Sequence, residues 1–241
     1  MKIFITGVSS GLGNEMVKRF LIDGHEVWGI SRRKKEDINS YSSMRGDFLY
    51  SVCDIQDENR MADVANEMIK NNFIPDVIIL NAASQENDFF SDSLSVSKFK
   101  EIFNINFGGS FFWVGFFLPF FQKRNKGKFI AISSLSAKYP LTKNKIAYST
   151  SKAALNMLFE SLGLQLSLSK VRFTIFNFGR LGEKGPFLGV TYKEAVKKIL
   201  KYVYYAENSR TINYPLFDYL LFKFIRFLPA KLVKKYIIKS N

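Results

Sequence analysis

Short runs of apolar, often β-branched residues alternate along the chain with longer segments whose apolar positions recur every three or four residues. The short runs predict strands over residues 2–5, 26–30, 50–52, 76–80, 128–132, 172–176 and 210–214. The longer segments predict helices over residues 14–23, 61–71, 99–121, 148–167 and 193–205. Strands joined by crossover helices lie parallel, so this order predicts a Rossmann-type, doubly wound parallel α/β sheet of about seven strands with helices on both faces.

No tract rich in Pro, Gly or Ser divides the chain, so we expect one domain over residues 1–214 and a C-terminal extension of that domain over 215–241. Two pieces of the extension, 215–228 and 230–239, place apolar residues at helical spacing beside lysines. Packing on the domain itself or on a partner subunit is the favoured interpretation. Peripheral contact with an anionic membrane is the alternative. Residues 111–121 contain Pro119 and are too short for a bilayer span, so they predict a buried or interface helix.

The composition suits one large core, because 47% of the 241 residues are apolar. The chain has 35 Lys and Arg against 21 Asp and Glu, a net charge of +14, without a nucleic-acid recognition motif, so no nucleic-acid partner is expected. A single cysteine, Cys53, and a single histidine, His25, exclude an intramolecular disulfide and argue against a metal site. The chain start does not resemble a secretory signal, and a cytoplasmic location is expected.

The connection between the first strand and the first helix is rich in glycine. It reads Thr6, Gly7, Val8, Ser9, Ser10, Gly11, Leu12, Gly13. Glycines allow a tight turn and a close approach of the backbone to a pyrophosphate, whose charge is met by the N–H groups that begin the helix. The loop therefore predicts a dinucleotide site.

The residues after the second strand bear on which dinucleotide is bound. Ser31, Arg32 and Arg33 offer no carboxylate for a ribose 2′-hydroxyl, whereas two guanidinium groups can hold a 2′-phosphate. This pattern favours NADP(H) over NAD(H). A solvated charge run that includes Lys34 and Lys35 is the alternative interpretation.

Tyr148 and Lys152 lie four residues apart at the start of a predicted helix, so they share one face. A tyrosine phenol has a pKa of about 10, and a nearby ammonium favours the phenolate. With the glycine loop, Asn81-Ala82-Ala83, Asn106 and the pair Ser133-Ser134, the sequence resembles the short-chain dehydrogenase/reductase family.

The resemblance implies roles for individual residues. Tyr148 would exchange the proton, Lys152 would lower the pKa of the phenol and hold the nicotinamide ribose, Ser134 would bind the carbonyl oxygen and Asn106 would hold a relay water. The implied cofactor contacts beyond the glycine loop and the arginine pair are Asp54, Ile55, Asn81, Ala82, Ala83, Tyr148, Lys152 and Gly179. Ala83 and Phe178 depart from the family pattern, and Ser133 and Ser136 are alternatives to Ser134 as the catalytic serine.

The resemblance implies an NADP(H)-dependent reductase of a small carbonyl compound, or the reverse alcohol dehydrogenase, with a hydrophobic or lipid-linked substrate as one option. A homodimer or homotetramer is expected, with the aromatic helix and the Tyr148 helix as its interface. The alternatives are an epimerase or dehydratase of nucleotide sugars and a non-catalytic, cofactor-binding scaffold.

Overall fold

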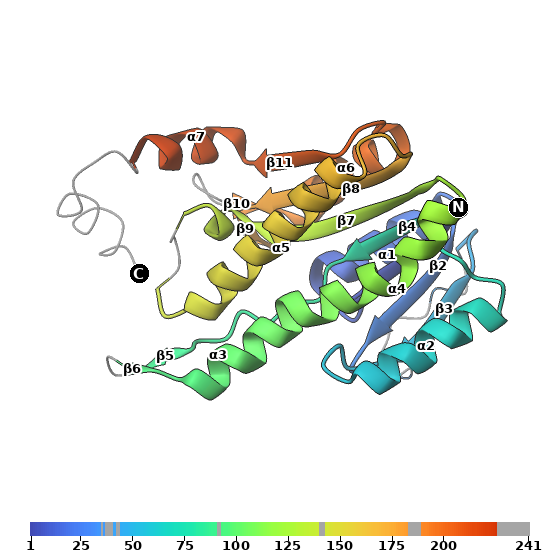
Figure 1. The fold of residues 1–241 in the computed structure, drawn as a ribbon, viewed down its shortest axis with the longest axis horizontal. Helices are drawn as coiled ribbons and strands as arrows, with labels where there is room; N and C mark the ends of the chain where they lie inside the picture. Colours follow the sequence, from blue (N-terminus) through green and yellow to red (C-terminus); the bar gives the residue numbers. More distant parts are fainter. Residues whose placement is uncertain are drawn as a thin grey trace.

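Seven parallel strands form the central sheet of the computed structural model, which describes residues 1–34, 36, 41, 44–90, 93–139, 143–182 and 189–225 (Figure 1). The strand order is β11-β8-β7-β4-β1-β2-β3. The strands are β1 (Lys2–Thr6), β2 (Glu26–Ser31), β3 (Phe48–Val52), β4 (Val77–Leu80), β7 (Gly127–Ser134), β8 (Val171–Phe178) and β11 (Arg210–Tyr214). The prediction of a doubly wound parallel sheet is confirmed.

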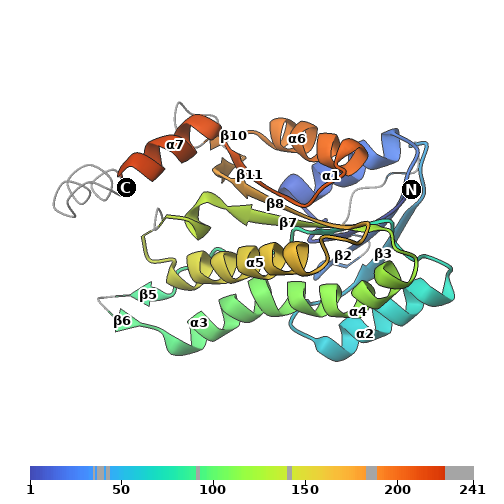
Figure 2. The ribbon, with the colours of Figure 1, turned by 45° about the horizontal axis from the view of Figure 1, so that its top comes forward.

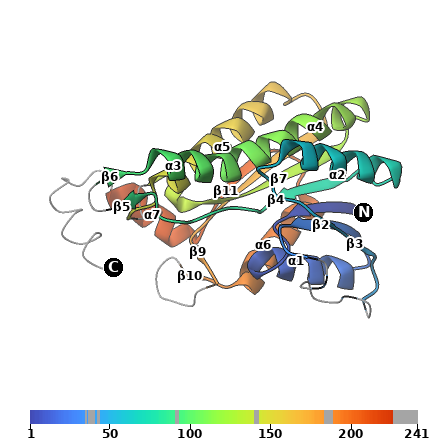
Figure 3. The same cartoon turned by 90° about the horizontal axis from the view of Figure 1, so that it is seen from below.

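Helices cover both faces of this sheet, as predicted (Figures 2 and 3). One face packs against α1 (Gly11–Ile22) and α6 (Tyr192–Tyr205), and the other against α2 (Glu58–Lys70), α4 (Gly109–Lys123) and α5 (Ile146–Gln165). Each face has its own apolar core, because the buried strands direct side chains to both sides of the sheet.

The predicted helix over residues 99–121 is longer than expected and is not a regular α-helix. It consists of α3 (Val96–Phe103), a π-helical turn η2 (Asn104–Gly108) and α4. Its length and apolar composition would allow it to span a bilayer. Trp113, Phe117 and Phe121 are nevertheless fully buried against the sheet, as in the core helix of a soluble domain.

Two further two-stranded pairs accompany the main sheet among the described residues: β5 (Phe89–Phe90) with β6 (Ser93–Leu94), and β9 (Arg180–Leu181) with β10 (Gly189–Val190). A 3-10 turn, η3 (Leu135–Ala137), follows β7. The helix α7 (Leu216–Ile225) follows β11, and the predicted second amphipathic piece at 230–239 lies outside the described residues, as does Lys35.

Candidate active site

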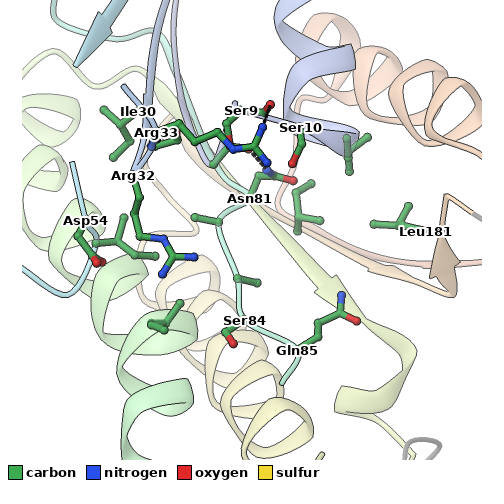
Figure 4. A pocket seen from close by; sticks show the side chains of 18 of the residues that line it. Ser9, Ser10, Ile30, Arg32, Arg33, Asp54, Asn81, Ser84, Gln85 and Leu181 are labelled. Atoms are coloured by element: carbon green, nitrogen blue, oxygen red, sulfur yellow. Dashed lines mark hydrogen bonds between the residues drawn. The ribbon is translucent and has the colours of Figure 1, made fainter. Parts of the chain in front are cut away.

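A cavity of about 680 Å³ opens at the edge of the sheet where the parallel strands end (Figure 4). This is where ligands bind in open α/β sheets, and the volume is within the range of ligand pockets. Among the predicted site residues, those that line the cavity are Gly7, Ser9, Ser10, Leu12, Ser31, Arg32, Arg33, Asp54, Ile55, Asn81, Ala82, Ala83, Tyr148 and Lys152. Thr6, Gly11, Gly13, Asn106, Ser134 and Gly179 are not in its lining.

The glycine loop is held in shape by the residues that follow β4. The Thr6 hydroxyl accepts hydrogen bonds from the backbone N–H groups of Asn81 and Ala82, each at 3.0 Å, while the Asn81 amide donates to the carbonyl of Gly7 at 2.9 Å. Gly7 has a φ of +73°, and a Cβ on Gly13 would lie 2.0 Å from the carbonyl oxygen of Gly7. Thr6 and Gly13 therefore fix the shape of the loop without lining the cavity themselves.

The start of α1 is suited to an anionic group. Ser10, at the N-cap, makes no side-chain bond to the helix, and the first turn carries no acidic residue. By contrast, Asp57, Ser95 and Thr191 cap α2, α3 and α6 through side-chain oxygens. The backbone N–H groups at the start of α1, with the positive end of the helix dipole, fit a phosphate at the cavity edge.

The two arginines after β2 both line the cavity but extend in different directions (Figure 4). The Arg33 guanidinium donates to the carbonyl of Ser9 at 3.5 Å, which holds it beside the glycine loop. Arg32 lies near Glu86, whose pKa is lowered by its hydrogen bond to Lys98, by the charge of Lys98 and by the charge of Arg32. The structure thus places both arginines in the cavity wall, with their guanidinium groups directed toward different parts of it.

The end of β3 contributes Cys53, Asp54 and Ile55 to the cavity wall. The Asp54 carboxylate accepts a hydrogen bond from the backbone N–H of Gln56 at 3.0 Å, which fixes its orientation. Burial raises the pKa of the Cys53 thiol to about 11, so the thiol stays protonated and unreactive at neutral pH.

Tyr148 and Lys152 project from the first turns of α5 and are both buried. Burial raises the pKa of Tyr148, and a hydrogen bond to Ser134 opposes this to a smaller extent. The Lys152 ammonium donates to the carbonyl of Ile132 at 2.9 Å, and burial lowers its pKa to about 8. Lys152 is therefore still mainly protonated at pH 7.

The three candidate serines occupy different positions. Ser134 is hydrogen-bonded to Tyr148, and its hydroxyl accepts the backbone N–H of Ser136 at 3.1 Å. Ser133 lines the cavity, and its buried hydroxyl has no hydrogen-bond partner in the described part of the chain. Among the three serines, Ser134 is therefore the one whose side chain contacts Tyr148. Ser136 contributes a backbone N–H that holds the Ser134 hydroxyl.

Asn106 is fully buried within the π turn and binds residues on both sides of it. Its carbonyl oxygen accepts the backbone N–H of Ser84 at 2.7 Å, and its amide donates to the Ser84 carbonyl and to the Ser151 hydroxyl, both at 3.0 Å. The Asn106 side chain thus ties the segment after β4 to the helix that carries Tyr148.

Asp88 is a residue of the site region that sequence reasoning missed. It is fully buried, and its carboxylate accepts hydrogen bonds from the backbone N–H groups of Ile146, at 2.8 Å, and of Ala147. Lys145, at the N-cap of α5, makes no side-chain bond there. Asp88 therefore caps α5, the helix that carries Tyr148, although it lies 58 residues earlier in the sequence. Capping motifs are recognised from neighbouring residues, so sequence reasoning could not find this contact.

Replacing Asp88 by Ala is expected to lower the free energy of unfolding by about 3 kcal/mol, because the backbone N–H groups of Ile146 and Ala147 lose a buried carboxylate as their acceptor. Asp57→Ala, at the exposed cap of α2, is the matched control and should cost about 1 kcal/mol. Urea unfolding of the three proteins measures both values. Equal losses for the two variants would contradict the assigned role of Asp88.

Other lining residues were also missed: Ile30, Ser84, Gln85, Glu86, Ile105, Ile132, Leu181 and Tyr192. Tyr192 begins α6, and its hydroxyl would lie 3.2 Å from a Cβ on Gly11 and 2.6 Å from one on Gly182. The tyrosine ring therefore lies between the glycine loop and the segment after β8.

The predicted cofactor contact Gly179 lies at the end of β8, outside the cavity lining. It donates its backbone N–H to the carbonyl of Tyr214, at the end of β11, at 2.9 Å.

Comparison of the sequence with known proteins identifies a family and several relatives. Residues 1–182 match the family described as short chain dehydrogenase. The 11-beta-hydroxysteroid dehydrogenase-like 2 protein of Arabidopsis thaliana is 31% identical over 169 residues, which are 68% of this chain and 54% of that protein. The chain thus spans about half the length of the first curated relatives it matches.

Solved structures share the fold at low sequence identity. A short-chain dehydrogenase from Streptomyces avermitilis superposes with a TM-score of 0.81 at 19% identity, covering 100% of this chain and 98% of that one. The closed form of serine dehydrogenase complexed with NADP+ has a TM-score of 0.79 at 19% identity, over 88% and 94% of the two chains. A Brucella melitensis 3-oxoacyl-[acyl-carrier protein] reductase with bound NAD has a TM-score of 0.75 at 15% identity, over 88% of each chain.

Proposed function

Because the chain belongs to the short-chain dehydrogenase/reductase family, we propose that it transfers hydride between NADP(H) and a small carbonyl or alcohol substrate, acting chiefly as a ketone reductase. The observation that carries this proposal is the pairing of Tyr148 with Ser134 and the placement of Lys152 one turn further along α5, at the wall of a nucleotide-sized cavity. These are the groups that a proton transfer coupled to hydride transfer requires.

The cofactor would be held by residues at the carboxyl ends of the strands. The glycine loop and the start of α1 would bind the pyrophosphate, Asp54 and Ile55 would contact the adenine, and Asn81, Ala82 and Ala83 would line the path to the nicotinamide. Gly179, at the end of β8, would lie behind the nicotinamide ring. When bound, the cofactor supplies the hydride, and the protein orients the reacting groups.

The protein residues supply the proton and stabilise the developing charge. In reduction, Tyr148 would donate its phenolic proton to the carbonyl oxygen, while Ser134 donates a hydrogen bond to the same oxygen. The Lys152 ammonium would stabilise the resulting phenolate and bind the ribose hydroxyl groups. Asn106 would hold the relay through which the proton on Tyr148 is replaced.

Turnover with a panel of ketoacyl thioesters, keto-sugars and hydrophobic ketones tests this proposal, with the loss of NADPH absorbance as the readout. Oxidation of NADPH by at least one ketone supports a reductase. Tight NADPH binding without turnover on any carbonyl compound would favour a cofactor-binding scaffold instead.

The preference for NADP(H) is proposed to reside in Arg32 and Arg33. Replacing both by Ala should raise the KM for NADPH by at least about 100-fold, because each charged hydrogen bond to the 2′-phosphate contributes on the order of 1.5–3 kcal/mol. The KM for NADH should stay nearly unchanged.

The control variant for the arginine pair is Lys34→Ala, which removes the next cation in the chain, outside the cavity lining. It should leave both KM values close to those of the wild type. A wild-type enzyme that uses NADH as well as NADPH, or equal losses for both cofactors in the double variant, would contradict the assignment.

We also propose a cytoplasmic homodimer or homotetramer in which α4 and α5 face a second subunit. Three apolar side chains on these helices are more than half exposed: Phe111 at 53%, Met157 at 64% and Leu164 at 78%. Oligomers are common in this family, and such an interface would remove these side chains from water.

A further inference from the structure

Helix α7 exposes an apolar stripe that no described part of the chain covers. Its members are Leu216, Phe217, Leu220 and Phe224, which are 60%, 69%, 52% and 70% exposed. Their spacing places them on one side of the helix. The opposite side carries Asp218, which is 4% exposed, and Tyr219 and Phe222, whose rings pack near Tyr139 with centroids 6.0 and 6.3 Å away. Helix α7 is therefore anchored by one face while its apolar face meets solvent.

The C-terminal sequence that contains the stripe carries mainly positive charge. On α7 the acidic residue, Asp218, is buried, whereas Lys223 is exposed. The sequence that follows, residues 226–241, contains five Lys and Arg and no Asp or Glu. Residues 215–241 together hold six basic residues and one acidic residue, so they contribute +5 to the net charge of +14.

The position of α7 in the fold is also relevant to the candidate site. Helix α7 directly follows β11, a strand parallel to its neighbour, and so lies at the end of the sheet where the parallel strands terminate (Figures 1 and 2). Tyr139, against which α7 packs, follows Ser134 by five residues. A surface that docks through α7 would therefore lie at the same end of the sheet as the cavity, on the side of the segment that follows β7.

We propose that the exposed stripe of α7 inserts into the surface of an anionic lipid bilayer. Apolar side chains on one face with cations beside them match both layers of such a surface, because the apolar residues reach the acyl boundary while lysines meet the phosphate headgroups. A symmetric pairing of two α7 helices fits less well, since it would bring two segments of charge +5 together.

Sedimentation of the full-length protein with lipid vesicles tests the proposal. Phosphatidylcholine vesicles that contain a quarter of phosphatidylglycerol should pellet the protein, pure phosphatidylcholine vesicles should pellet it much less, and added salt should release it. The double variant Leu220→Glu with Phe224→Glu should bind the anionic vesicles at least about tenfold more weakly.

The matched control replaces two apolar side chains far from α7. Ile22→Glu with Leu168→Glu changes residues that are 51% and 102% exposed, near the ends of α1 and α5, and should bind vesicles as the wild type does. Thermal unfolding checks that both double variants fold.

Two results would overturn the proposal. One is a wild-type protein that stays in the supernatant with anionic vesicles, or an α7 variant that pellets as well as the wild type does. The other is a lipid-free dimer that the α7 variant converts to a monomer in sedimentation velocity, which would assign the stripe to a second copy of the chain. Neither result depends on turnover of NADPH, so the proposed reductase activity is tested separately.

Discussion

Tyr148→Phe is expected to lower kcat for carbonyl reduction by about 10³-fold, because the variant has no proton to donate to the carbonyl oxygen. The phenol is buried and hydrogen-bonded to Ser134, so the substitution removes one oxygen atom and leaves the packing of α5 in place. Steady-state kinetics with NADPH and a reducible ketone give kcat, and fluorescence titration with NADPH gives the cofactor affinity, which should change little.

A second tyrosine provides the control for this experiment. Tyr202 lies on α6, on the opposite face of the sheet, where it packs against Phe176. Tyr202→Phe removes the same atom and should keep kcat within about twofold of the wild type. If Tyr148→Phe retains wild-type turnover on every ketone that the enzyme reduces, Tyr148 is not the acid.

Lys152→Met is expected to have opposite effects on activity and stability. Loss of the ammonium removes the charge that favours the phenolate and a partner of the ribose, so kcat/KM should fall by about 10³-fold. Stability should rise at neutral pH, because the wild type buries a cation whose pKa is about 8 against the ordinary value of 10.5. That difference corresponds to about 3 kcal/mol as an upper value.

The pH dependence of the stability gain follows from the same shift. Between about pH 8 and 10.5 the unfolded wild type binds a proton at Lys152 that the folded protein has released, so wild-type stability rises with pH in this window. The advantage of Lys152→Met should therefore be largest below pH 8 and nearly absent above pH 10.5.

Urea unfolding of the wild type and Lys152→Met at pH 7, 9 and 10.5 measures this trend, with the exposed Lys201→Met as the control. A gain of stability that does not change with pH would show that improved packing, rather than removal of a buried charge, stabilises the variant.

The sheet and the glycine loop were predictable because their signals are local. Each strand is a short apolar run, and the loop from Gly7 to Gly13 lies between a strand and a helix whose own patterns are clear. The pairing of Tyr148 with Lys152 was equally local, since four residues on a helix span one turn.

The parts of the site that the sequence did not reveal depend on contacts between distant segments. Asp88 caps a helix that begins 58 residues later, and nothing in its own neighbourhood indicates this role. Gln85, Glu86 and Tyr192 reach the cavity from a loop and from the start of α6, where residue type alone carries no signal for nucleotide binding. The choice among the three serines also required the position of the Tyr148 hydroxyl.

The π turn at Asn104–Gly108 holds one residue more than a regular α-helix would need to join α3 to α4 in the same orientation. A π turn closes hydrogen bonds five residues apart, one more than an α turn, and one residue corresponds to about 100° of rotation about the axis. Deleting a single residue here would therefore give an unbroken α-helix in which Trp113 and Phe117 keep nearly the same orientation toward the sheet relative to α3, but it would remove the wide turn that holds Asn106. The packing of α4 on the sheet should therefore survive such a deletion, whereas the hydrogen bonds of Asn106 to Ser84 and Ser151 should be lost.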